Sequence, residues 1–101
     1  MIQNQVISKI DLVSEQLRRF KTEDYINSLR HPPRFCEDMD KLGLIWSDIF
    51  RVIFDYDLIR HHDSSGDCFC VEGHTLCGKN IAVVLVVYDC DIKVLKLWET
   101  L

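Results

Sequence analysis

The stretch from Cys68 to Glu99 most constrains the fold, because it holds three apolar, β-rich runs joined by two short turn signals. The runs cover residues 68–74, 81–88 and 92–98. β-Branched and aromatic residues between turn residues predict strands, and connections this short favour antiparallel neighbours. The middle run has no polar alternation, so we expect burial on both faces, with other elements covering each side of the sheet.

The first part of the chain has the periodicity of an amphipathic helix. Over residues 4–21, Val6, Ile10, Val13, Leu17 and Phe20 recur at alternating spacings of four and three, which forms one apolar stripe. Packing on the sheet accounts for such a stripe. The alternative is a seam for a partner helix, including that of a second copy in a homodimer, because the same spacing suits a coiled coil.

Turn and cap residues divide the rest of this region into shorter elements. Thr22 is expected to N-cap a helix over residues 23–29, which the proline pair at 32–33 must end. A third helix is predicted over 34–42, ending at Gly43, and a fourth from Ser47 or Asp48. A short strand at 58–60 would be the fourth of the sheet.

These elements predict a single α+β domain over residues 1–101. Residues 1–30 form an N-terminal helical region, and residues 34–101 form an α+β core. The helices are expected to pack on a three- to four-stranded antiparallel meander sheet.

Composition limits the classes of function. No apolar run approaches the ~20 residues of a membrane-spanning helix, and residues 1–5 lack the pattern of a signal peptide, so we expect a cytoplasmic protein without membrane contact. The five cysteines are an odd number and are expected to be thiols. The net charge of −4 argues against a purely electrostatic nucleic-acid binder, but it is compatible with a local basic patch.

A group of potential zinc ligands lies within ten residues of sequence, at Cys68, Cys70, His74 and Cys77. Strand geometry places Cys68, Cys70, Glu72 and His74 on one face, where two cysteines of one strand diverge from a common point. A zinc-binding domain is therefore only a minor alternative, and we predict no metal and no cofactor. Free cysteine is commonly a small buried apolar residue.

A second group of residues is basic and ionisable, and it includes Arg34, Arg60, His61, His62 and Lys96. RNA cleavage without a metal needs a base for the 2′-hydroxyl proton, cations for the phosphate and an acid for the 5′-oxygen. Histidine titrates near neutral pH and suits either proton role, and arginine holds phosphate with two parallel hydrogen bonds. The alternative is that His61 and His62 are solvated loop residues.

Other residues offer weaker alternatives. Tyr56 or Tyr88 would suit an acid or a stacking platform, although tyrosine on a strand more often packs. Cys36 with a histidine would suit a thiol nucleophile, but no local motif supports this pairing.

Two segments carry a resemblance to a known group of toxins. Residues 39–44 (MDKLGL) followed by 47–53 (SDIFRVI) resemble the middle of the MqsR-type toxins, where a helix ending in an acidic-x-Leu-Gly-Leu segment precedes a helix with a Val-Ile pair. The later stretch, from residues 73–81 onward to Trp98 and Glu99, resembles an uncharacterised related family. Both groups are allied to RelE-like toxins, which are compact α+β proteins that cleave messenger RNA and are neutralised by an antitoxin.

The resemblance implies a metal-independent endoribonuclease, or mRNA interferase, of a toxin–antitoxin system, with RNA and an antitoxin as partners. Arg60, His61 or His62 would then lie near the phosphate, with Arg34 or Lys96 assisting. The sequence departs from the related families at three places. Arg34 and Phe35 stand where His-Ala usually begins the third helix, and no tyrosine enters the central strand. The turn after the fourth helix offers Arg60, His61 and His62 where the MqsR-type toxins have a lysine. A non-catalytic protein-interaction module on the same scaffold is the alternative.

Overall fold

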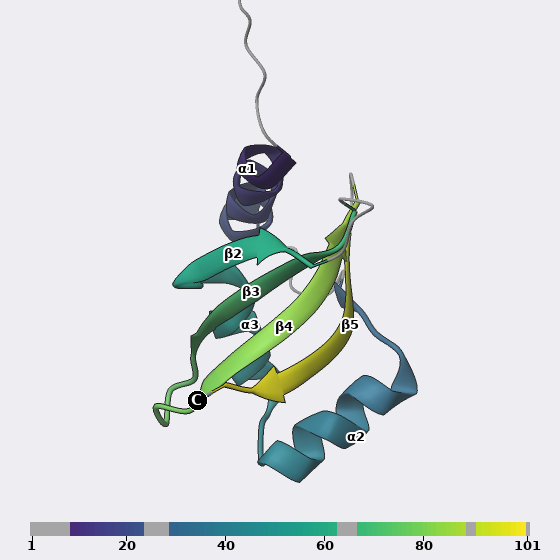
Figure 1. The fold of residues 1–101 in the computed structure, drawn as a ribbon, viewed down its shortest axis with the longest axis vertical. Helices are drawn as coiled ribbons and strands as arrows, with labels where there is room; N and C mark the ends of the chain where they lie inside the picture. Colours follow the sequence, from purple (N-terminus) through teal and green to yellow (C-terminus); the bar gives the residue numbers. More distant parts are fainter. Residues whose placement is uncertain (1–8, 24–28, 63–66, 89–90, 101) are drawn as a thin grey trace, which may run out of the picture.

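The computed structural model describes residues 9–23, 29–62, 67–88 and 91–100. Within them the chain forms three helices and one five-stranded sheet (Figure 1). The elements are α1 (Lys9–Glu23), β1 (Leu29–Arg30), α2 (Pro33–Leu42), α3 (Trp46–Phe54), β2 (Leu58–His61), β3 (Phe69–His74), β4 (Asn80–Val87) and β5 (Ile92–Glu99).

The strands lie in the order β1-β5-β4-β3-β2. Neighbouring strands from β2 to β5 are antiparallel, as the short connections predict, and β2 confirms the expected fourth strand. The prediction of a purely antiparallel meander is wrong, because β1 pairs in parallel with β5 through Leu29 and Ile92. The sheet is therefore mixed and has five strands.

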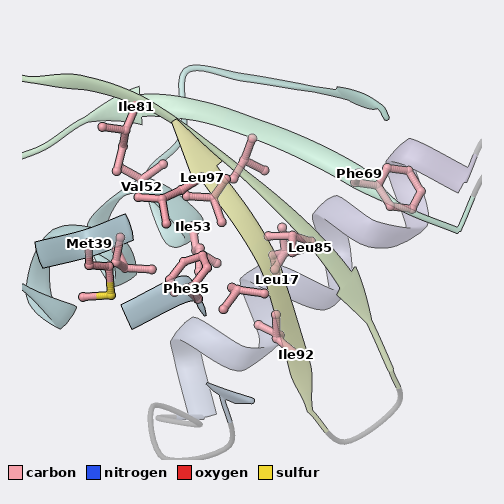
Figure 2. Packing of buried hydrophobic residues seen from close by; sticks show 14 of the residues in the cluster. Leu17, Phe35, Met39, Val52, Ile53, Phe69, Ile81, Leu85, Ile92 and Leu97 are labelled. Atoms are coloured by element: carbon pink, nitrogen blue, oxygen red, sulfur yellow. The ribbon is translucent and has the colours of Figure 1, made fainter. Parts of the chain in front are cut away.

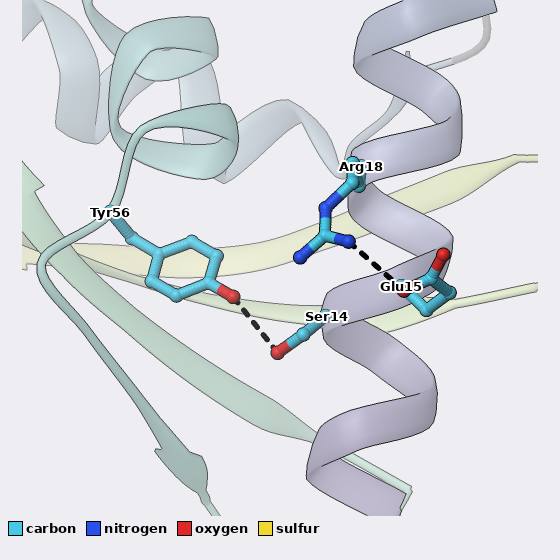
Figure 3. A network of polar contacts seen from close by, with 4 residues as sticks. All are labelled: Ser14, Glu15, Arg18 and Tyr56. Atoms are coloured by element: carbon cyan, nitrogen blue, oxygen red, sulfur yellow. Dashed lines mark hydrogen bonds and ion pairs between the residues drawn. The ribbon is translucent and has the colours of Figure 1, made fainter.

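Helix α1 is attached to the sheet by its apolar stripe. Leu17 and Phe20 are buried in the core, and Ile10 and Val13 pack against it, which agrees with packing on the sheet for this part of the stripe; Val6 lies outside the described residues. The hydroxyl of Tyr56 also donates a hydrogen bond to Ser14 Oγ at 2.9 Å, which ties α1 to the segment before β2 (Figure 3).

The prediction of a short helix over residues 23–29 is wrong at both of its ends, which belong to other elements. Residues 22 and 23 belong to α1, and Leu29 begins β1; residues 24–28 lie outside the described residues. Leu29 pairs with Ile92 of β5 and so becomes part of the sheet. Helix propensity predicts structure weakly where pairing with a distant strand competes with it.

The next two helices confirm their local signals. Pro33 occupies the first turn of α2, where its missing N–H costs nothing, and Gly43 ends the helix at φ +69°. The Asp48 carboxylate, in the first turn of α3, accepts a hydrogen bond at 3.0 Å from the backbone N–H of Ile45, the residue that precedes the helix. Helix α3 begins at Trp46, one residue before Ser47 and two before Asp48, the two predicted starts.

All three helices bury their apolar residues against the same face of the sheet. Leu17 of α1, Phe35 of α2 and Ile53 of α3 belong to one core cluster with Val83 and Leu85 of β4. Figure 2 shows these helices' side chains converging on one side of β4 and β5. We call this side the helix-covered face.

The opposite side of the sheet, which we call the open face, has no described helix over it. Its centre is nevertheless buried: Cys70 and Ala82 are fully inaccessible and Val84 is 1% exposed. Among the described residues, the expectation that other elements cover both sides is therefore met on the helix-covered face only. The residues at the centre are small, and the long side chains of the neighbouring strands cover them.

None of the described helices is both long enough and apolar enough to cross a membrane.

Candidate functional site

Two of the predicted site residues lie in one row across the open face. Strand register aligns Arg60 with Cys70, Cys70 with Val84, and Val84 with Lys96. Side chains that are directly opposite on neighbouring antiparallel strands share a face. Arg60 and Lys96 therefore stand at the two ends of a row whose middle is buried and apolar. Burial raises the pKa of the Cys70 thiol, and the positive charges of Arg60 and Lys96 partly oppose that rise.

A carboxylate lies beside one of these cations. Glu72 is two residues beyond Cys70 on β3, so it projects from the same face, and it forms an ion pair with Arg60. Both side chains remain partly exposed, at 46% for Arg60 and 26% for Glu72. An acidic and a basic group are thus held together at a solvent-accessible position on the sheet.

A predicted site histidine, His62, lies beside the indole of Trp98 on the same face. The His62 ring lies 6.2 Å from the Trp98 ring, and Lys96 Nζ lies 5.9 Å from the indole centroid. Trp98 packs against the buried cluster of Cys70, Ala82 and Val84. The open face therefore gathers three predicted site residues, Arg60, His62 and Lys96.

A bulge in β5 makes this gathering geometrically feasible. Val84 pairs with Lys96, but the next residue, Leu85, pairs with Val94, so Leu95 is an extra residue in β5. Ile92, Val94 and Leu97 all face the helices. Strict alternation from Val94 would turn Lys96 and Trp98 toward the core, and the extra residue instead places them on the open face.

Charge is distributed unevenly over the fold. Acidic residues outnumber basic residues over 33–57, the segment that carries α2 and α3 on the helix-covered side. The open face carries Arg60, Lys96 and, by alternation with Ile92 and Val94, Lys93, and these cations outnumber the Glu72 carboxylate that pairs with Arg60. The net charge of −4 therefore coexists with a local basic surface, because charge over a patch and charge over the whole chain are separate quantities.

The structure does not bring the other two predicted site residues to this group. The His61 ring lies 4.9 Å from the ring of Phe69, a core residue of the helix-covered face. Arg34 is exposed in the first turn of α2, whose Phe35 and Met39 pack into that same core. Adjacent histidines thus point to opposite faces, as period-2 geometry requires.

Several other ionisable residues have structural partners. Lys79 Nζ donates to the carbonyl of Leu42 at 2.8 Å, which places a cation at the C-terminus of α2. The Arg30 guanidinium pairs with Asp91 at 3.1 Å and lies 5.3 Å from the ring centroid of Tyr88.

Cys36 lies near a histidine, as one alternative requires. The distance from its sulfur to His31 Nδ1 is 3.7 Å, and the His31 ring lies 4.8 Å from that of Trp46.

Of the four potential zinc ligands, Cys68 packs against the cluster that contains Cys70, whereas His74 and Cys77 contact other residues. Cys70 is buried under the open face, Cys77 is exposed in the β3–β4 turn, and His74 Nδ1 lies 2.6 Å from Asp57 Oδ2. Within the described ranges, no three His, Cys, Asp or Glu side chains are placed to hold a metal ion. The geometry thus gives the zinc alternative no support.

The thiols of Cys77 and Cys70, whose pKa values shift in opposite directions, should differ in reactivity. A hydrogen bond with the Thr75 hydroxyl at 3.2 Å lowers the pKa of Cys77, whereas burial raises that of Cys70. Because the thiolate is the reactive form, iodoacetamide at pH 7.5 should label Cys77 well before Cys70, as followed by peptide mass spectrometry. Thr75→Val should slow labelling of Cys77, and faster labelling of Cys70 would contradict this arrangement.

Two residues of the open-face group were missed as site residues by sequence reasoning. Glu72 was assigned to the correct strand face, but only as a neighbour of potential zinc ligands. Trp98 was read as the end of a strand, because its face depends on the bulge at Leu95. Strand alternation carried a signal for Glu72, whereas the sequence carries none for the bulge.

Comparisons of the chain with protein-family models, with curated proteins and with solved structures gave no significant match.

Proposed function

We propose that the chain is a toxin-like, metal-independent endoribonuclease that works on the open face of its sheet. The observation that supports this most strongly is the grouping of Arg60, Glu72, His62 and Lys96 around an apolar floor and an indole. These side chains supply the charge types that metal-free RNA cleavage needs, namely a proton acceptor, a proton donor and cations.

The roles follow from the chemistry of each group. Glu72 accepts the proton of the 2′-hydroxyl, whose oxygen attacks phosphorus and forms the O2′–P bond. Arg60 and Lys96 stabilise the negative charge that develops on the phosphoryl oxygens. The P–O5′ bond breaks, and protonated His62 donates a proton to the leaving oxygen. The products are a 2′,3′-cyclic phosphate and a free 5′-hydroxyl.

The ion pair suits this mechanism in one further respect. The Arg60 guanidinium contacts Glu72 directly, so a phosphate bound by Arg60 would bring its adjoining ribose close to the carboxylate. Positioning of this kind is a large part of catalysis where no covalent intermediate is formed. In this proposal an antitoxin neutralises the enzyme by binding a surface that includes the open face.

The test is cleavage of a 5′-labelled single-stranded RNA by the purified protein in excess EDTA, with the new ends identified chemically. We expect 2′,3′-cyclic phosphate ends. Because each removes a group that acts in the transition state, Arg60→Ala and His62→Ala should lower the rate by about 100-fold or more.

The chain offers close controls for both variants. His61→Ala removes the adjacent histidine on the other face, and Arg34→Ala removes an exposed arginine of α2. Both should leave cleavage near the wild-type rate. Intact RNA with retained RNA binding would refute the nuclease and favour a non-catalytic interaction module. Equal losses in His61→Ala and His62→Ala would remove the open face from the mechanism.

A further inference from the structure

Trp98 packs on the open face but is not fully buried. It lies on the open face, half-buried, at the margin of a small cluster of Cys70, Ala82 and Val84. A tryptophan on a face that no described helix covers offers a large flat ring beside Lys96 and His62. The indole can stack with another flat ring, while the cationic side chains beside it contact charged groups at the edge of that ring.

The cations around Trp98 follow a line along β5. Lys93, Lys96 and Trp98 share the open face, because the bulge at Leu95 resets the alternation between Val94 and Leu97. At about 3.3 Å per residue, Lys93 and Trp98 are roughly 15 Å apart along the strand. A flexible polyanion with flat bases matches this sequence of charges and ring, whereas an acidic peptide would leave the indole without a stacking partner.

From this arrangement we propose that the open face selects single-stranded RNA, with one unpaired base stacked on Trp98 and the adjoining phosphates on Lys96 and Lys93. This inference rests on the proposed function, since it assigns a substrate class to the same face. Bases in a duplex already stack on their neighbours, so only an unpaired base is available to the indole. Trp98 is therefore a specificity-determining residue and takes no part in proton transfer.

The two tryptophans allow binding to be observed separately from cleavage. Trp46 lies among Phe35 and His31, on α3 of the helix-covered side. Trp46→Phe leaves Trp98 as the only indole, and Trp98→Phe leaves Trp46. The ligand is a 2′-O-methyl oligonucleotide of mixed sequence, which lacks the nucleophilic hydroxyl and cannot be cleaved by the proposed route. The competitor is the same sequence as a blunt duplex.

We expect the single strand to quench Trp98 fluorescence in Trp46→Phe and to leave Trp46 fluorescence nearly unchanged in Trp98→Phe. Trp98→Leu should weaken single-strand binding by roughly 5- to 150-fold, the range found for one stacked base. Lys93→Ala with Lys96→Ala should weaken binding and reduce its salt dependence. Lys41→Ala, on α2, is the control and should change neither.

The outcomes separate this inference from the nuclease proposal. Duplex binding as tight as single-strand binding, binding without a response of Trp98, or no binding would overturn the inference. If RNA is cleaved while Trp98 remains unresponsive, the nuclease stands and the stacking site fails. If Trp98 is quenched by the single strand but no RNA is cleaved, the stacking site stands and the nuclease fails.

Discussion

Glu72→Gln should lower the rate of RNA cleavage by about 10²- to 10⁴-fold, because it removes the only carboxylate paired with Arg60 among the described residues. The amide oxygen can still accept a hydrogen bond from Arg60, so the local packing should be kept while the proton acceptor is lost. The measurement is single-turnover cleavage of labelled RNA, together with thermal melting and binding of the 2′-O-methyl oligonucleotide.

Glu99→Gln is the matched control for this variant. Glu99 lies on β5, is exposed, and is in register with Ile81 of the helix-covered core. Its replacement should leave cleavage unchanged. A Glu72→Gln protein that cleaves at the wild-type rate would show that another group accepts the proton, and the Arg60–Glu72 pair would then be a structural contact.

Val83→Asp should abolish cooperative folding at 25 °C. Val83 is fully buried on the helix-covered face of the central strand, in register with Val71 and Leu97, and none of these neighbours can pair with a carboxylate. Burying an unpaired charge costs several kcal/mol, which is comparable with the total stability of about 5–15 kcal/mol for a small domain. Circular dichroism and thermal melting provide the measurement.

Val84→Asp tests the same substitution one residue further along, on the other face. Its cross-strand neighbours are Cys70 and Lys96, and the row ends at Arg60, so a carboxylate here has cations within its own row. We expect a folded protein with a lower melting temperature. Equal unfolding of both variants, or a stable Val83→Asp protein, would contradict the division into a helix-covered and an open face.

Local signals predicted most of the fold, and they failed where pairing is remote. Gly43 and Pro33 bound α2, as their conformational preferences predict, and Asp48 holds the start of α3 through the backbone N–H of Ile45. Strand β1 was missed because Leu29 and Arg30 carry no strand pattern of their own. Their pairing with β5 joins residues more than sixty positions apart in sequence, and no local periodicity reports it.

The apolar run of β4 correctly predicted a buried strand, but it did not indicate what buries each face. Hydrophobicity on both sides predicted a covering element on each face, yet Ala82 and Val84 are covered by side chains of their own sheet. Small residues in the centre of a face can be buried by longer neighbours without any second layer. The pattern therefore predicted burial correctly, and among the described residues the sheet's own side chains supply the cover on the open face.

For the candidate site, sequence reasoning identified the residue types better than their placement. Arg60, His62 and Lys96 reach one face, whereas His61 and Arg34 lie on the helix-covered side. The two histidines could not be distinguished from sequence because the phase of β2 is fixed only by its register with β3.

The most direct test of the open face as an RNA-binding surface is amide chemical-shift mapping with the 2′-O-methyl single strand. We predict that the shifts concentrate in β2, β3 and β5 around Arg60, Glu72, Lys96 and Trp98, with the Trp98 indole N–H among the most affected signals. The exposed residues of α1 and α2 should show little change. Shifts concentrated on α1 or α2, with the open face unaffected, would contradict this assignment.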